Sequence, residues 1–574
     1  MFNCLIIDRS ANDCSAEKAQ NIDSEVFLFL TRSNQKVTSM LTRPLPNAAQ
    51  AASRKKKKTC ACLRLPLSVA IACIYPSVAY SLPQNPDVAA GSVSMSTSDR
   101  TMQINQTSNK AIINWKRFGI GPNESVIFNQ PSRTSVVLNR VSGAESSVLD
   151  GALSANGQVF LINPNGVLIS PTAHINVSGL LASTLDLENH QFLDNNYLFN
   201  GKSTSEAAAV INDGAINAVD GGYVVMLSGK VRNNGVIDAP SGHVLMGAGS
   251  QATLYINDSS LLGYRIDAGS AAALVENVNR INADGGQVSL AARGLTGASQ
   301  LASAAVNNSG IIEARTLDGK PGAISLTADM QNGRVYLNGT LDASASSGKG
   351  GTVDTAAFAV SVDSNAQVST DSLSGIAGLW TITSGNPVIG ANLNDVSNTA
   401  LSNALDRSNV TVVANGQGVD NNGNLSVQRE IASQSSNRLV LKSANNLLIN
   451  APVSMGSGGF LAHADTTGTG VGKLIIAAEA SVRASEGAPI DIYTNVPDYK
   501  DTTVYDGFIS SPYRLWMLVN NVHQLQGMES NLSGRYALGR DIDAAETASW
   551  NGGAGFTPLG LGSRRFDGQL DGMN

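Results

Sequence analysis

A seven-residue phrase recurs in the middle of this 574-residue chain and constrains its fold more than any other feature. The phrase reads Asn, any residue, Gly, any residue, Ile, any residue, Ala, and a glycine and an alternating apolar segment follow each copy. Two glycines of the phrase, Gly214 and Gly235, lie 21 residues apart, whereas Gly310 and Gly339 lie 29 apart. The copies are Asn212–Ala218, Asn233–Ala239, Asn308–Ala314 and the variant Leu337–Ala343.

A period of about 20 residues with two short strands per copy indicates a solenoid. Helical repeats are excluded by the β-branched alternation and the Asn-Gly punctuation. Leucine-rich repeats are excluded because Leu does not recur at their fixed positions. We therefore predict an all-β fold, a parallel β-helix with Ile, Val, Leu and Ala turned inward. We also expect Gly or Asn to occupy corners with positive φ.

The first 79 residues differ in character from the rest of the chain. They contain all five cysteines and a cationic run, Arg54–Lys58, followed by an apolar segment, Leu65–Ile74. This segment is too short to span a bilayer of about 30 Å as a helix. Small residues then precede a cleavage site expected between Ala79 and Tyr80, which is typical of a secretory signal. We interpret residues 1–79 as an extended leader plus signal peptide, with Met1 or Met40 as the start.

Export explains the absence of cysteine after the leader. A secreted protein without disulfides needs a large continuous core, which a β-helix provides. The formal net charge of −6 is unlike that of a nucleic-acid-binding protein, and we expect no nucleic-acid partner.

A specific string lies closer to the start of the expected mature chain, within residues 111–184. It contains Gly-Gln-Val-Phe-Leu-Ile-Asn-Pro-Asn-Gly at residues 157–166. Residues Gln158–Ile162 are predicted to form a strand. Asn163, Pro164, Asn165 and Gly166 are predicted to form a turn, since Pro presets φ while Asn and Gly accept left-handed conformations.

This string resembles the secretion domain of two-partner secretion exoproteins, the filamentous haemagglutinin family, and most of all its high-molecular-weight adhesin branch. The resemblance implies a right-handed β-helix with an amino-terminal cap over residues 80–350, recognised by an outer-membrane transporter barrel. Asn163, Pro164, Asn165 and Gly166 match the family's second signature turn, a secretion motif. The first signature, expected near residues 129–132, is only partly present. The turn either shapes the first coils or contacts the transporter, and the sequence leaves both roles open.

The carboxyl-terminal part continues the pattern and then changes. Residues 351–505 contain further coil-like phrases, and Val522–Gly527 is predicted to form a short helix. Residues 506–574 resemble the lead-in to the Gly-Leu-rich repeats of large bacterial adhesins, and Phe566–Gly572 resembles the opening of the first repeat. We expect the chain to be truncated there, because a repeat array that stops in its opening phrase cannot bury its own face.

Catalytic and metal-binding patterns are weak throughout the sequence. The histidines are scattered without paired ligand spacing, and neither a nucleophile elbow nor a phosphate-binding loop is found. We therefore expect no metal, no cofactor and no enzyme activity. The rival is a β-helix enzyme that acts on polysaccharides, which needs Asp residues and Arg or Lys converging on one face. The acidic residues of the repeats, such as Asp213, Asp238 and Asp342, are expected to stand singly at turns.

These features predict a secreted or cell-surface adhesin of the two-partner pathway. The expected partners are the inner-membrane Sec machinery, the outer-membrane transporter barrel and an unknown receptor on host cells or bacteria. The expected route passes through the periplasm. An alternative is the export module of a cytolysin or growth-inhibition toxin. Sequons at Asn105 and Asn176 are candidates for glycosylation.

Overall fold

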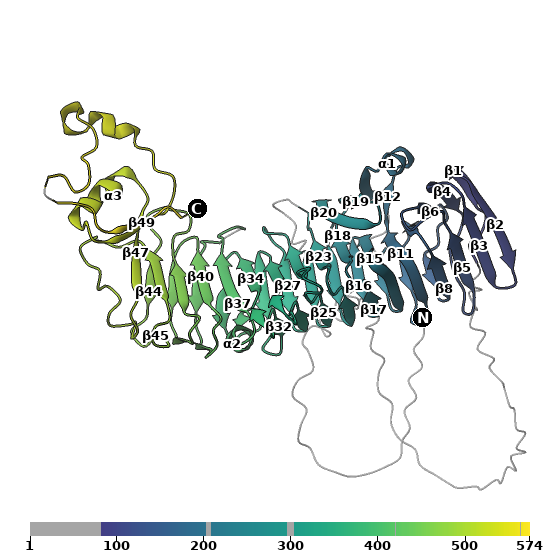
Figure 1. Ribbon diagram of the computed structural model, residues 1–574. Coiled ribbons are helices and arrows are strands. Elements are labelled where there is room, and N and C mark those ends of the chain that lie inside the picture. Colours follow the sequence, from purple (N-terminus) through teal and green to yellow (C-terminus); the bar gives the residue numbers. More distant parts are fainter. Residues whose placement is uncertain (1–81, 202–207, 296–303, 419–420, 563, 574) are drawn as a thin grey trace, which may run out of the picture. The chain divides into compact units, whose positions relative to one another are not determined.

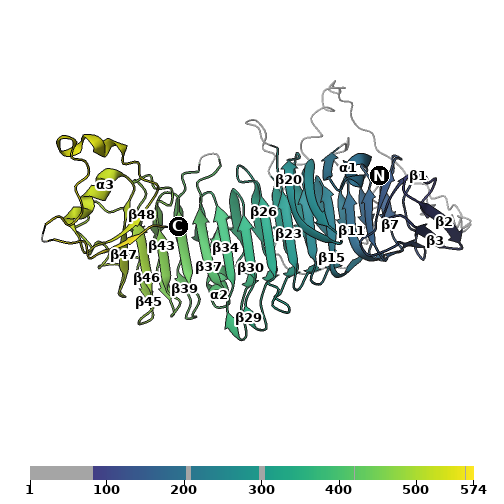
Figure 2. The same ribbon diagram turned by 45° about the horizontal axis from the view of Figure 1, so that its top comes forward.

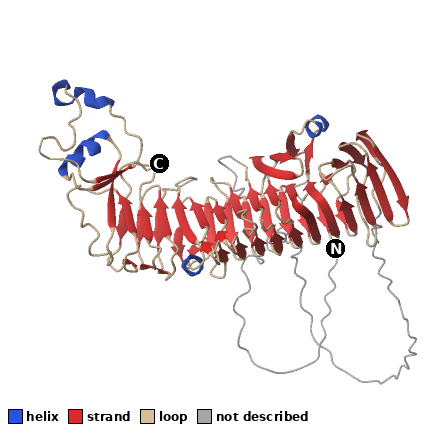
Figure 3. Ribbon diagram, viewed as in Figure 1, coloured by secondary structure: helices blue, strands red, loops and turns tan. Residues whose placement is uncertain are grey.

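Three parallel β-ladders run side by side through the part of the chain that the structure describes. The computed structural model describes residues 82–201, 208–295, 304–418, 421–562 and 564–573. These residues all belong to one compact unit, Ser77–Asn574. The leader and the expected cleavage site between Ala79 and Tyr80 lie outside the described residues. Strands dominate the described residues, and the helices are short (Figures 1 and 3).

Successive coils add strands to these ladders, and within a ladder each strand pairs in parallel with the equivalent strand of the next coil. Figure 2 shows this succession for the longest series, which we name ladder B. Its strands are β4 (Lys110–Trp115), β6 (Val136–Val141), β9 (Gln158–Ile162), β11 (His174–Ser183), β15 (Ala215–Ser228), β18 (His243–Ala248), β23 (Gln287–Ala292), β26 (Ala323–Ala328), β30 (Thr352–Ala356), β34 (Leu379–Ser384), β37 (Asn409–Ala414), β40 (Leu439–Ser443), β43 (Phe460–His463), β46 (Ile490–Thr494), β47 (Arg514–Val519), β48 (Arg535–Leu538) and β49 (Gln569–Asp571).

Ladder A shares the long strands β11 and β15, whose first halves belong to it. Its other strands are β3 (Thr101–Gln106), β5 (Ser125–Asn129), β8 (Ala152–Ala155), β17 (Val236–Asp238), β22 (Arg280–Asn282), β25 (Ile311–Glu313), β28 (Thr340–Asp342) and β32 (Gln367–Ser369). A short helix, α2 (Asn398–Leu405), contacts β32 at the end of this ladder. A small parallel sheet forms farther along, from β39 (Ile431–Ala432), β42 (Val453–Met455) and β45 (Val482–Ala484).

Ladder C forms a separate parallel sheet. Its strands are β7 (Ser147–Leu149), β10 (Val167–Ile169), β14 (Val210–Asn212), β16 (Lys230–Asn233), β21 (Leu274–Asn277), β24 (Ala305–Asn308), β27 (Arg334–Leu337), β31 (Ala359–Val362), β36 (Val396–Ser397), β35 (Val388–Gly390), β38 (Leu425–Val427), β41 (Leu447–Ile449) and β44 (Leu474–Ile476). The inward side chains of all three ladders form one continuous apolar core. The predicted parallel β-helix, including the strand Gln158–Ile162, is confirmed.

An antiparallel cap covers the first coils. Strand β1 (Asp87–Ala90) pairs with β4, and β2 (Val93–Ser98) pairs with β3, both antiparallel. Beneath them Trp115 is fully buried, and its Nε1 donates to Oδ1 of Asn139 at 3.0 Å. The remaining short elements are β29 (Gly348–Lys349) paired with β33 (Gly375–Ile376), the 3-10 helices Met528–Ser530 and Ala545–Gly553, and α3 (Val522–Gly527), where the predicted helix is confirmed.

The repeated asparagine has a different role from the one we expected. Asn212, Asn233, Asn277 and Asn308 are buried at the ends of ladder C strands. Nδ2 of each of the first three donates to Oδ1 of the next at 2.8 Å. None of them has a positive φ. The expectation of left-handed asparagine corners is therefore wrong here. The four residues instead form a buried column of hydrogen bonds, which we call the asparagine ladder.

The glycine of the phrase is also required for a reason other than φ. Gly235 has no positive φ, but a Cβ on it would lie 2.0 Å from the carbonyl oxygen of Gly214 in the preceding coil. Close stacking of the backbones therefore selects glycine. The expectation of positive φ holds instead at Gly221 and Gly285, in the Gly-Gly pairs that precede ladder B strands.

Candidate functional site

The predicted secretion turn is a buried junction between coils. Asn163 has no exposed surface, and its Nδ2 donates to the carbonyl of Glu145 at 2.9 Å and to Oγ of Ser147 at 3.0 Å. Its Oδ1 accepts a hydrogen bond from the backbone N–H of Asn165 at 2.9 Å. The side chain thus closes its own turn and also fixes the neighbouring coil.

The other residues of the turn extend the same junction. Gly166 has a φ of 114°, which favours glycine, and its N–H donates to the carbonyl of Asn163 at 3.0 Å. Nδ2 of Asn165 donates to the carbonyl of Gly143 at 2.8 Å. Pro164 and Asn165 are half-buried, so only these two present side-chain surface to a partner. The geometry favours the first of the two roles, in which the turn shapes the first coils.

A second sheet, which we did not predict, lies outside the coils. It is antiparallel and packs on the outer face of ladder B, with a core of its own that includes Leu245, Leu261 and Tyr223 (Figure 1). We call it the outer sheet. Its strands, in spatial order, are β12 (Leu185–Leu187), β13 (Tyr197–Gly201), β19 (Gln251–Asn257) and β20 (Ser260–Ala268).

Lys110, the first residue of β4, ties ladder B to α1 (Asn189–Leu193), which lies between β12 and β13 of the outer sheet in the sequence. Its Nζ donates to the carbonyls of Phe192 and Leu193, at 2.6 and 2.7 Å, at the end of α1. The same ammonium lies 5.2 Å from the centroid of the Phe192 ring and 5.9 Å from that of Tyr197. Burial lowers the pKa of Lys110 from its ordinary value, against the opposing effect of Asp194.

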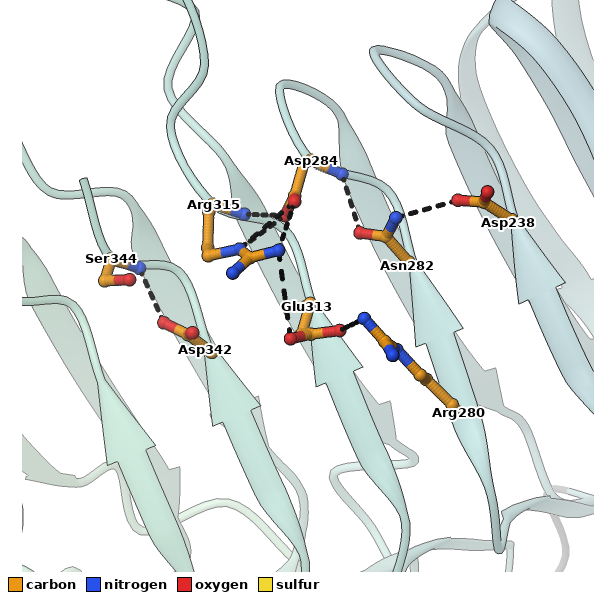
Figure 4. A network of polar contacts seen from close by, with 8 residues as sticks. All are labelled: Asp238, Arg280, Asn282, Asp284, Glu313, Arg315, Asp342 and Ser344. Carbon is orange, nitrogen blue, oxygen red and sulfur yellow. Dashed lines mark hydrogen bonds and ion pairs between the residues drawn. The ribbon is translucent and has the colours of Figure 1, made fainter. Parts of the chain in front are cut away.

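Acidic residues of the repeats gather on one face of ladder A, in contrast to our expectation that they stand singly. The register aligns Asp238, Asn282, Glu313 and Asp342 in successive coils. Figure 4 shows this row together with the two arginines that lie beside it. The prediction of isolated turn carboxylates is wrong for Asp238 and Asp342, because stacking of coils brings together residues that are far apart in sequence.

Two arginines pair with carboxylates in this row or beside it. Arg280 pairs with Glu313 at 2.6 Å, and Arg315 forms a forked pair with Asp284, with contacts between 2.6 and 3.1 Å (Figure 4). The hydrogen bonds that Arg315 donates to Asp284 raise the pKa of Arg315 above its ordinary value. Because each pair joins residues of adjacent coils, the network acts as a clamp.

A second charged group lies on the outer face of ladder B, farther along the chain. Asp491 accepts hydrogen bonds from Arg514 at 2.6 and 2.7 Å, from Arg438 at 2.7 Å and from Nε1 of Trp516 at 3.3 Å. Burial alone would raise the pKa of Asp491, but these hydrogen bonds outweigh it and lower the pKa. Beside it, the rings of Tyr493 and Trp516 stack 5.6 Å apart, and His463 lies 5.3 Å from Tyr493.

His463 makes stability depend on pH. Burial, and then the charge of Lys442, lowers the pKa of His463 to about 4, whereas an unfolded histidine titrates near 6.5. Between these values the unfolded chain binds a proton that the folded chain does not, so stability present above pH 6.5 is lost as pH falls toward 4. The shift corresponds to about 3 kcal/mol.

Thermal unfolding at pH 7.0 and pH 4.5 tests this expectation. His463→Gln should lose less stability between the two conditions than the unaltered protein. His190→Gln is the control, since that imidazole is largely exposed. An equal loss in His463→Gln and the unaltered protein would contradict the prediction.

The segment that contains the cap, the outer sheet and the first coils matches a known protein family. The TPS secretion domain family matches residues 79–342. These residues are similar to a TPS secretion domain. The family is one of secretion domains and not of enzymes. Within the described part of the chain, no helix has the length and apolar character needed to cross a membrane.

Individual known proteins are similar to this chain as well. The crystal structure of the HMW1 secretion domain from Haemophilus influenzae is similar, with a TM-score of 0.51 and 25% identity over 70% of this chain and 98% of that chain. Two proteins of H. influenzae, both named heme/hemopexin-binding protein, are 38% and 32% identical over 240 and 273 residues. These matches cover 40% and 43% of this chain but only 26% and 28% of the relatives, so the chain spans about a quarter of their length.

Proposed function

We propose that this chain is the export module of a secreted or surface-attached adhesin of the two-partner pathway. The carrying observation is the match of residues 79–342 to the TPS secretion domain family, in a β-helix similar to the HMW1 secretion domain. The amino-terminal β-helix serves as the signal that an outer-membrane transporter barrel recognises. The signal peptide delivers the chain to the Sec machinery, and the transporter takes it from the periplasm to the outside.

The fold suits passage as an extended chain. Each ladder strand pairs in parallel with the strand of the preceding coil, so a coil already outside offers its edge to the next one. All five cysteines precede residue 80, so oxidation in the periplasm has no thiol to trap in the mature chain. Folding outside, coil by coil, is then a consequence of the repeat architecture.

Co-expression with and without the cognate transporter tests the proposal. Full-length protein should reach the medium or the cell surface only when the barrel is present, and should stay in the periplasm without it. Secretion that persists without any partner barrel would refute the two-partner route. Purified protein should then bind epithelial or bacterial cells. Cleavage of pectate or another glycan by the same preparation would favour the enzyme alternative.

The turn Asn163–Gly166 is proposed to promote secretion by shaping the first coils. Asn163→Ala removes the donor to Glu145 and Ser147, and we expect a loss of about 1–3 kcal/mol together with reduced secretion. Pro164→Ala should leave both stability and secretion near those of the unaltered protein. Thermal unfolding and secretion yield are measured for both variants. A Pro164→Ala protein that folds normally but is not secreted would show direct contact with the transporter instead.

The names of the two H. influenzae relatives suggest a second candidate, capture of haem or of its carrier hemopexin. Both relatives exceed 30% identity to this chain over the matched segment, which is the observation that favours it. Binding of hemopexin by the purified protein, without binding to cells, would favour this function over adhesion.

A further inference from the structure

A cavity of about 200 Å³ lies where the outer sheet meets ladder B. Strand β20 is the edge of the outer sheet, where it pairs with β19 (Figure 1), and its residues Leu261, Gly263 and Tyr264 line one side of the cavity. The floor is the outward face of two adjacent ladder B strands, β18 and β23. Rigid strands therefore line the cavity on both sides.

The floor alternates polar and apolar groups in register. His243 of β18 lies beside Gln287 of β23, and Leu245 lies beside Ser289. Leu261 and Tyr264 close the cavity from β20. Leu245 and Leu261 are buried, so an apolar wall faces a rim of imidazole, carboxamide, hydroxyl and phenol groups.

The four polar side chains that line the cavity make no hydrogen bond or ion pair within the described part of the protein. They are those of His243, Tyr264, Gln287 and Ser289. Gln287 is exposed and the other three are half-exposed, so all four are free to bond with a ligand, and a few polar groups beside an apolar wall are typical of a ligand site. The cavity therefore offers several hydrogen-bonding groups to a ligand.

The absence of charge among the lining residues favours a neutral ligand. Burial lowers the pKa of His243 from its ordinary value, so the imidazole is neutral at pH 7. No other residue that lines the cavity is charged at that pH. An anion or cation would lose its hydration without gaining a counter-charge.

The volume of the cavity limits the size of the ligand. The volume is below the roughly 300–1,000 Å³ of sites for drug-sized ligands, so a macrocycle such as haem is too large. A sugar ring combines hydroxyl groups for the polar rim with C–H groups for the leucine wall. We propose that this cavity binds one neutral sugar residue, a hexose or N-acetylhexosamine, of a glycan. The proposal goes beyond export and is independent of the transporter.

Titration of the purified full-length chain with N-acetylglucosamine and with galactose tests the proposal, with binding followed by saturation-transfer NMR and calorimetry. At least one of the two sugars should bind saturably, with a Kd of about 1 mM. Ser289→Leu fills the floor and should weaken binding at least tenfold. Ser325→Leu is the matched control, because Ser325 occupies the equivalent outward position one coil farther along, outside the lining of the cavity.

Tyr264→Phe removes a single hydroxyl group and should weaken binding severalfold, which keeps the proposal testable if Ser289→Leu fails to fold. Thermal unfolding checks both variants. The proposal is wrong if neither neutral sugar binds or if N-acetylneuraminic acid, an anionic sugar, binds equally well. It is also wrong if Ser325→Leu weakens binding as much as Ser289→Leu.

Discussion

Replacing Trp115 with alanine is expected to lower the free energy of unfolding of the capped first coils by about 4 kcal/mol or more. Removal of a fully buried Trp side chain costs about 3–5 kcal/mol through lost contacts and the cavity left behind. The change also leaves Oδ1 of Asn139, itself buried, without the hydrogen bond from Nε1, at about 1–3 kcal/mol. Phe118 loses its edge-on ring contact as well.

Urea unfolding followed by circular dichroism measures this loss of stability. Amide hydrogen exchange shows which strands lose protection. Trp115→Phe is the control, because it keeps most of the ring and removes only the hydrogen bond, so its loss should be about 1–3 kcal/mol. Exchange should accelerate in β4, β6 and β9 and stay unchanged in β40 and β43, since repeat proteins open locally. Equal stability of Trp115→Ala and the unaltered protein would contradict the prediction.

Replacing Asn233 with alanine is expected to break the asparagine ladder and cost about 2–6 kcal/mol. Asn233 accepts from Asn212 and donates to Asn277, both at 2.8 Å, and all three side chains are fully buried. The substitution leaves a donor on one neighbour and an acceptor on the other without partners. Each orphaned group costs about 1–3 kcal/mol in an interior that water does not reach.

Asn234→Ala is the matched control for the ladder. Asn234 is the next residue, is half-buried and donates to Asp213 at 2.6 Å, so its loss should be about 1 kcal/mol. Thermal unfolding compares the two variants, and hydrogen exchange at the N–H of Gly235, which donates to the carbonyl of Asn212, reports on the ladder directly. A melting temperature of Asn233→Ala equal to that of Asn234→Ala would show that the ladder adds no stability.

The coils could be predicted from the sequence, because the residues that form them recur at a regular interval and act through near neighbours in the chain. Alternation of Ile, Val and Leu with polar residues defines an inward face wherever it occurs, and a fixed period repeats that face. One copy was still missed, at Asn277–Ala283, because Asn279 stands where the phrase has Gly. The structure aligns Asn277 with Asn233 and Asn308 in adjacent coils.

The outer sheet was not predicted, because the residues that form it do not recur at a regular interval in the sequence. Strands β12 and β13 come from one interruption of the coils, and β19 and β20 come from another. Neither hairpin pairs with a ladder, and their pairing with each other, such as Tyr197 with Leu254, joins segments more than fifty residues apart. The cavity below β20 follows from that pairing, so it could not be foreseen either.

The sequence by itself determined the repeat, the β-helix and the turn at Asn163–Gly166, because periodic apolar residues, Asn, Gly and Pro act through neighbours in the chain. Only the tertiary structure decided what the repeated polar residues do. Stacking of coils turns each asparagine into a link of a buried ladder, and pairs the acidic residues of one coil with the arginines of the next. These contacts join positions twenty or more residues apart, and their energy depends on burial that no single repeat provides.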